Sequence, residues 1–168
     1  MLLETMEDLL LDQLRDLYSI ETQIEVALPT IVEQSTSVAL RELLTEHFEE
    51  TEGQIVRLQE IFGRLGVNAR GPRCLGIAAL LQEAGDTMRR CSGSVLDAAI
   101  IACMQRVEHY EMASYGAAIG YSRQLGMCHV VELLTVSRDE EVAAELTLSQ
   151  LAETEALEHG AQAGVLAA

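Results

Sequence analysis

The sequence predicts an all-α protein, a bundle of four long helices with a shorter fifth helix in one of the connections. Leu, Ala, Glu and Gln are abundant, and the 168 residues include only two prolines, which favours long uninterrupted helices. Apolar residues also recur at three- and four-residue steps, which places them on one face of a helix. The chain is long enough to bury the core of one domain. We expect residues 1–168 to form that domain, with the bundle over about 4–159 and a short flexible C-terminal tail.

Break residues set the bounds of the predicted helices. Thr5 and Asp8 have the spacing of a capping box at the start of the first helix. Gly66 suits the C-cap of the second helix. We expect the long helices at about 5–34, 37–65, 94–126 and 128–158, and the short helix near 75–89.

The connections indicate how these helices are arranged. The first two helices are joined by a few residues, and so are the last two, which predicts two antiparallel hairpins. The hairpins are separated by residues 67–93. A helix of ~28 residues is ~42 Å long, so a chain that returns along it needs a long crossover. Two hairpins joined by one long crossover make the ferritin-like arrangement.

The charge balance disfavours two classes of partner. The formal net charge is −16, and all 11 basic side chains are Arg. A nucleic-acid-binding protein needs a basic face, and an anionic membrane surface attracts one. We therefore expect no nucleic-acid partner and no membrane partner, and no apolar run approaches the ~20 residues of a membrane span.

The cysteines indicate a reducing compartment. Four cysteines occur, and no two of them have the Cys-x-x-Cys spacing of a zinc or thioredoxin motif. The acidic N-terminal segment does not resemble a signal peptide. We expect free thiols and a cytoplasmic protein.

A carboxylate pair in the third long helix is the strongest sign of a site. Glu108 and Glu111 are three residues apart and share a helical face with Tyr115 among core-sized side chains. A carboxylate is costly to bury unless it is paired or bound to a metal. This stripe is therefore either a solvated rim or a functional site.

Other carboxylates fall at the same level of the predicted bundle. Glu21 and Glu50 lie almost equally far from the turn near residue 36, within about one residue rise, ~1.5 Å. Glu111 and Glu141 lie at matching distances from the other hairpin turn, within about two residue rises, ~3 Å. Hard and borderline divalent ions take such oxygen ligands, with imidazole completing the set. The candidate ligands of Fe or Mn, two ions in all, are Glu21, His47, Glu50, Glu108, Glu111 and Glu141.

Four segments, Asp12–Glu21, His47–Gln54, Cys74 and Gln105–Glu111, together resemble the YciF-type bacterial stress proteins. That family is part of the ferritin-like superfamily, near rubrerythrin. The resemblance covers roughly residues 4–158 and implies a rubrerythrin-like bundle, commonly a homodimer, with a di-metal site and no firmly assigned reaction.

The resemblance also implies which residues would bind the metal ions. Glu108 and Glu111 match the Glu-x-x-Glu pair of rubrerythrin, and Glu21, Glu50 and Glu141 match single Glu ligands on the other helices. The His expected three residues after Glu50 and Glu141 is absent, because Gly53 and Ala144 occupy those positions.

Two functions remain open from the sequence. The first is a stress-response di-iron or di-manganese protein that reacts with peroxide or oxygen, with a tyrosine donating a hydrogen bond to the bound oxygen species. The second is a non-enzymatic helical dimer whose Glu cluster is a polar network satisfied by Arg15, Arg106 and water. In the second case His47 is a capping or surface residue. In both, we expect His109 at the bundle flank and a solvated face carrying Asp139, Glu140 and Glu153.

Overall fold

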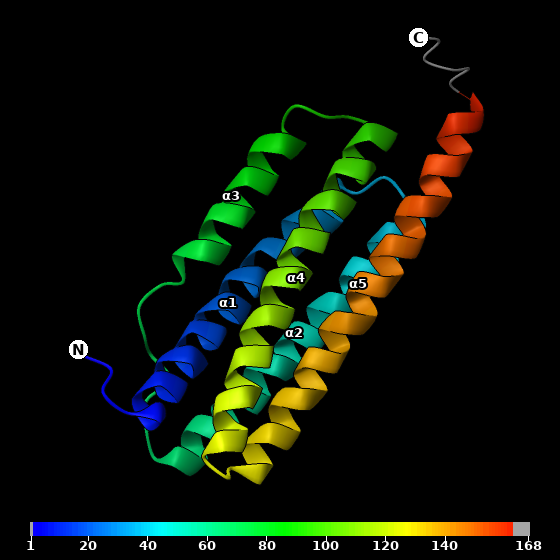
Figure 1. Ribbon diagram of the computed structural model, residues 1–168. Coiled ribbons are helices and arrows are strands. Elements are labelled where there is room, and N and C mark those ends of the chain that lie inside the picture. The colour runs from blue at the N-terminus through cyan, green and yellow to red at the C-terminus, as the bar shows by residue number, and fades with distance from the viewer. Residues whose placement is uncertain (1, 163–168) are drawn as a thin grey trace.

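Five helices form the protein in a computed structural model that describes residues 2–162, with side chains placed over 2–154 (Figure 1). No strand occurs within residues 2–162, as predicted. The helices are α1 (Met6–Gln34), α2 (Val38–Leu65), α3 (Leu75–Met88), α4 (Ser94–Gln124) and α5 (Cys128–Gln162). The predicted bounds agree to within a few residues. Helix α5 continues past the predicted end, and residues 163–168 of the predicted flexible tail lie outside the described part.

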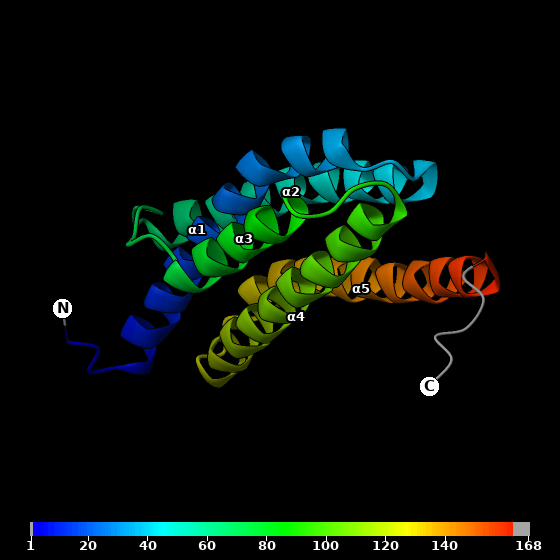
Figure 2. The same cartoon turned by 90° about the horizontal axis from the view of Figure 1, so that it is seen from above.

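The four long helices pack as two antiparallel hairpins. Seen from above, α1 and α2 form one layer and α4 and α5 form the other (Figure 2). Helix α3 lies in the crossover between the hairpins, against α1 and α4. The predicted four-helix bundle with a long crossover and a short fifth helix is confirmed.

Helix ends follow the predicted capping signals. The Asp8 backbone N–H donates to Thr5 Oγ1 at 3.1 Å, and the Thr5 N–H donates to the Asp8 carboxylate at 3.1 Å. This reciprocal pair is the capping box expected from the sequence. Gly66 ends α2 with φ 66°, a left-handed conformation that a glycine adopts without steric cost.

A buried aspartate holds the α1–α2 turn against the start of α4. Asp97 is only 3% exposed, and it accepts hydrogen bonds from the backbone N–H groups of Thr36 at 2.8 Å and Ser37 at 3.1 Å. The Ser35 hydroxyl donates to the same carboxylate at 3.3 Å. One side chain therefore fixes the first hairpin relative to the second and satisfies two N–H groups at the start of α2.

The core is a continuous apolar seam between the two layers. Leu14, Leu17, Ile24 and Leu58 are essentially inaccessible to solvent, and each lies on the stripe that the three/four period predicts. None of the helices that the structure describes has an apolar stretch of the length that crossing a membrane requires. At mid-height the apolar seam is interrupted by acidic side chains.

Candidate metal centre

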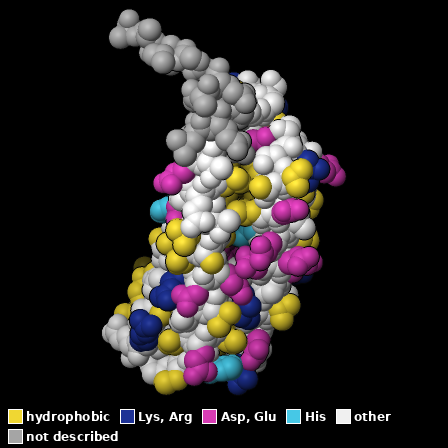
Figure 3. Space-filling model, turned by 90° about the vertical axis from the view of Figure 1, so that its right-hand side faces the viewer, with side chains coloured by type: hydrophobic (Ala, Val, Ile, Leu, Met, Phe, Trp, Pro, Cys, Tyr) yellow, Lys and Arg dark blue, Asp and Glu magenta, His cyan; other side chains and the backbone are white. Residues whose placement is uncertain are grey.

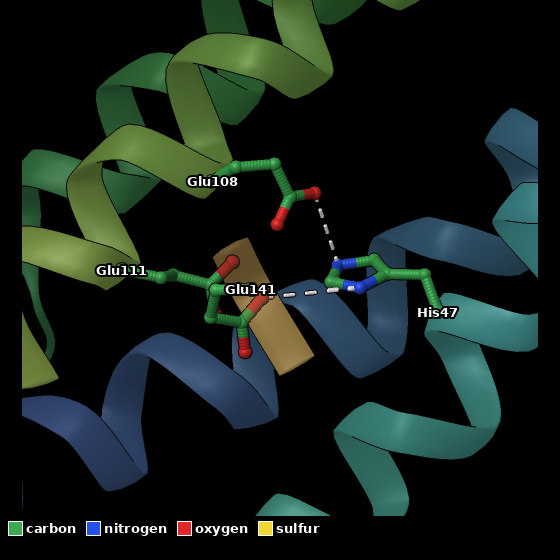
Figure 4. A group of neighbouring side chains, drawn as sticks. All are labelled: His47, Glu108, Glu111 and Glu141. Atoms are coloured by element: carbon green, nitrogen blue, oxygen red, sulfur yellow. Dashed lines mark ion pairs between the residues drawn. The ribbon is translucent and has the colours of Figure 1, made fainter. Parts of the chain in front are cut away.

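Four side chains from three helices meet in the middle of the bundle. His47 comes from α2, Glu108 and Glu111 from α4, and Glu141 from α5 (Figure 4). One potential ligand atom of each lies within 4.8 Å of the others, and all four residues are buried. His47 Nε2 is 3.4 Å from Glu108 Oε1, and His47 Nδ1 is 4.0 Å from Glu141 Oε2. The helical spacing explains the α4 pair, since residues three apart share a face.

Glu21 on α1 adds a fourth buried carboxylate and a fifth residue to the cluster. It is 0% exposed, and the Tyr115 hydroxyl donates a short hydrogen bond to its Oε1. The other oxygen, Oε2, has no hydrogen-bond partner. Tyr115 thus holds one side of this carboxylate and leaves the other side available.

A polar clamp from α2 supports Glu141. The buried Gln54 side chain donates to Glu141 Oε1 and to Glu140 Oε2, the second at 3.2 Å. The Arg57 guanidinium pairs with Glu140 and donates to Ser137 Oγ at 2.9 Å. The sequence predicts a solvated face for Glu140, but its side chain is only 23% exposed and pairs with Arg57. Gln54 contacts the cluster at Glu141 and Arg57 contacts the adjoining Glu140, but neither is among the candidate site residues from the sequence.

Glu50 is not part of the four-residue cluster. It is half-buried and lines a pocket of about 80 Å³ between α2 and α5, together with His47. In an α-helix, two residues three apart differ by about 60° in direction around the axis. When the His47 ring points inward, Glu50 therefore points to the side of the bundle.

Burial dominates the electrostatics of the cluster. Loss of hydration raises the pKa of Glu108 to about 8 and that of Glu50 to about 7. Burial, followed by repulsion from Glu141, raises the pKa of Glu111 well above its ordinary value. Burial likewise raises the pKa values of Glu21 and Glu141, and it lowers the pKa of His47 to about 4. At neutral pH the His47 ring is uncharged, so the nearby carboxyls have no cationic partner there and several keep their protons.

The unpartnered atoms of the cluster suit a cation. Nine buried side-chain nitrogen and oxygen atoms in the described part lack a hydrogen-bond partner, and seven of them belong to Glu21, His47, Glu108, Glu111 and Glu141. Buried polar groups are normally satisfied, so this concentration is unusual. Carboxylate oxygens with one imidazole form a donor set that fits divalent Fe or Mn.

Other residues considered from the sequence lie elsewhere. His109 Nδ1 bonds the Gln105 carbonyl oxygen at 2.8 Å on the exposed surface, as expected for the bundle flank. Arg15 donates to the Asn68 carbonyl oxygen, and Arg106 pairs with Glu83. Neither arginine satisfies the Glu cluster, and His47, at 2% exposed, is not a surface residue.

Fold and site together define a class, a helical bundle of ferritin-like architecture with a buried carboxylate–histidine cluster at its centre. The comparisons with known proteins place the chain within that class. The family model of a domain of unknown function, DUF892, matches residues 5–161. The protein therefore belongs to the DUF892 family.

Relatives of known structure have the same fold. Protein YciF of Escherichia coli (strain K12) is 34% identical over 152 residues, which cover 89% of this chain and 92% of that protein. The crystal structure of the E. coli stress protein YciF matches with a TM-score of 0.88 at 32% identity, covering 92% of this chain and 99% of that one.

Two further structures extend the comparison. YcfI from Rhodopseudomonas palustris, for which a structural role is suggested, matches with a TM-score of 0.85 at 46% identity, over 87% of this chain and 94% of that one. A protein from Xanthomonas campestris shares the fold, with a TM-score of 0.74 at 18% identity, over 94% and 99% of the two chains. The resemblance to YciF-type stress proteins expected from the sequence is confirmed.

Proposed function

We propose that this protein is a di-metal carboxylate protein that binds Fe or Mn at the cluster of His47, Glu108, Glu111 and Glu141. The four ligand atoms, which lie within 4.8 Å of one another, would coordinate the first ion. Glu21, with one unpartnered oxygen, would extend the carboxylate set toward the second ion. The single observation that carries the proposal is the set of buried, unpartnered ligand atoms, because bound ions would give a partner to the carboxylate oxygens and to one nitrogen of His47.

The residues around the centre would hold and position such ions. Bound Fe or Mn would supply the redox capacity to react with peroxide or oxygen, as in a stress-response protein. Burial raises the pKa values of the Glu108 and Glu141 carboxyls, so these groups must release their protons when an ion binds. The neutral His47 ring already exposes a nitrogen lone pair toward the cluster. Gln54 fixes one oxygen of Glu141 by its hydrogen bond, which leaves the other oxygen to the ion.

Metal content and metal-dependent stability test the proposal. We expect protein purified without chelators to retain Fe or Mn in elemental analysis, and added Mn²⁺ to raise the melting temperature of the chelated protein by mass action. Glu108→Gln and Glu141→Gln keep the side-chain size but remove the ligand charge, so each should lose most of that rise. Glu49→Gln, at an exposed position of α2, is the matched control and should behave as wild type.

A second candidate is a structural protein whose acidic cluster stays metal-free. The Gln54–Glu141, Tyr115–Glu21 and Arg57–Glu140 contacts favour it, because they satisfy part of the network without an ion. The structural role suggested for YcfI is also in its favour. If the protein is structural, added Mn²⁺ or Fe²⁺ should leave the wild-type melting temperature unchanged. This result would distinguish the structural protein from the di-metal protein.

The partner and the compartment are further parts of the proposal. Exposed apolar side chains on several helices, such as Val26 and Leu75 at 77% exposure each, would be covered in a homodimer. The four cysteines are free thiols, which fits a reducing cytoplasm. Light scattering of the protein at micromolar concentration tests the dimer, and a clean monomer mass would reject it.

A further inference from the structure

The pocket between α2 and α5 reaches the buried imidazole from outside. Its lining comprises Leu43, Glu46, His47, Glu50, Ala143, Ala144 and Thr147. His47 is 2% exposed and both its ring nitrogens lack hydrogen-bond partners. Glu46 and Thr147, by contrast, are exposed. The pocket of about 80 Å³ has room for several water molecules, so it joins solvent to a ligand of the centre.

The walls of this pocket differ in chemistry. The α2 wall carries two carboxylates, Glu46 at the surface and Glu50 half-buried below it. The α5 wall carries the small side chains of Ala143 and Ala144, which leave the space open. Figure 3 shows the α2–α5 face of the molecule, where acidic side chains gather at mid-height. Carboxylates at the opening of a pocket raise the local concentration of cations.

We propose that this pocket is the route by which metal ions enter the centre, and that Glu50 is a transfer ligand rather than a permanent one. The inference rests on the proposed function of the cluster. Glu50 and His47 line the same pocket, but Glu50 lies outside the set of four ligand atoms. In the proposed route Glu50 holds an ion at the pocket and passes it to His47, which lines the same pocket. A transfer role accounts for the position of Glu50, three residues after His47 but outside the four-residue cluster.

The rate of Mn²⁺ uptake tests the route separately from the final occupancy. Loss of the free Mn²⁺ signal in electron paramagnetic resonance measures uptake by the chelator-treated full chain. Glu50→Gln should slow uptake about tenfold, the lower end of electrostatic steering effects, while the final number of ions bound stays at the wild-type value. Ala144→Leu fills the pocket without replacing a ligand and should slow uptake in the same way. Glu49→Gln, exposed and outside the pocket lining, should load at the wild-type rate.

The outcomes separate failure of the route from failure of the metal site. Uptake by Ala144→Leu at the wild-type rate, with helicity intact by circular dichroism, would overturn the route. A lower final occupancy in Glu50→Gln would make Glu50 a permanent ligand and overturn its transfer role, with the metal site retained. If the wild type binds no Mn²⁺ and no Fe²⁺ at equilibrium, the metal site itself is absent and the route falls with it.

Discussion

The metal-free protein should lose stability as the pH rises from 7 to 8.5. In this range the unfolded chain has ionised glutamates and mostly neutral histidine. The native state still holds protons on its buried carboxyls, because burial raises the pKa of Glu108 to about 8 and raises those of Glu21, Glu111 and Glu141 well above their ordinary value. A raised native pKa stabilises the fold at low pH, and that contribution is lost as the pH rises through the native pKa.

The magnitude follows from the number of protons held. One extra proton in the native state lowers the free energy of unfolding by about 1.4 kcal/mol per pH unit. Glu108, which titrates within the range, accounts for about 1 kcal/mol, or roughly 2–4 °C in melting temperature for a domain of this size. The raised pKa values of Glu21, Glu111 and Glu141 act in the same direction. His47, with its pKa lowered to about 4, acts in the opposite direction only at lower pH.

Urea titrations followed by circular dichroism at 222 nm, in the presence of a chelator, measure this loss. Saturating Mn²⁺ should abolish the loss, because the ion replaces the protons. Glu108→Gln should reduce it by about 1 kcal/mol, and the exposed-site variant Glu49→Gln should leave it unchanged. A free energy of unfolding that stays constant from pH 7 to 8.5 in the chelated wild type would show that the cluster is not a set of protonated buried carboxyls.

Three substitutions away from the ligands test the structural assignments, each by thermal melts and urea titration. Asp97→Ala leaves two N–H groups of the α1–α2 turn without their acceptor, so it should lower the free energy of unfolding by about 3 kcal/mol; a loss below 0.5 kcal/mol would contradict the role of Asp97. Gly53→Ala should stabilise α2 by up to about 1 kcal/mol, because its Cβ would meet Arg57 Nη1 at an ordinary 3.5 Å; a destabilised variant would show that Gly53 has a packing role. Gly76→Ala should destabilise, since its Cβ would lie 2.7 Å from Tyr110 Cζ and displace that ring; a wild-type melting temperature would show that the ring moves freely.

The sequence alone determined the helices and their connections. Apolar periodicity, the Thr5–Asp8 capping box and Gly66 act locally, within one or two helical turns. The crossover of residues 67–93 follows from helix length, because a chain must travel back along the bundle before it can start another hairpin. These features depend on near neighbours in the sequence, and the structure confirms them.

The sequence also determined the level of the candidate site along the bundle. Counting residues from each hairpin turn placed Glu21, Glu111 and Glu141 at mid-height, and all three are buried there. Rise per residue is nearly constant in a helix, so axial position can be read from the sequence. The same count placed Glu50 at this level, where it lines the adjoining pocket.

Only the tertiary structure decided which of these side chains face one another. Direction around a helix axis changes by about 100° per residue, and the rotation of each helix is set by how all its neighbours pack. That rotation turned His47 and Gln54, seven residues and about two turns apart, toward the centre and turned Glu50 toward the α2–α5 pocket. It also brought Arg57 of α2 onto Glu140 of α5. Such pairings join residues more than 80 positions apart, so no local pattern in the sequence specifies them.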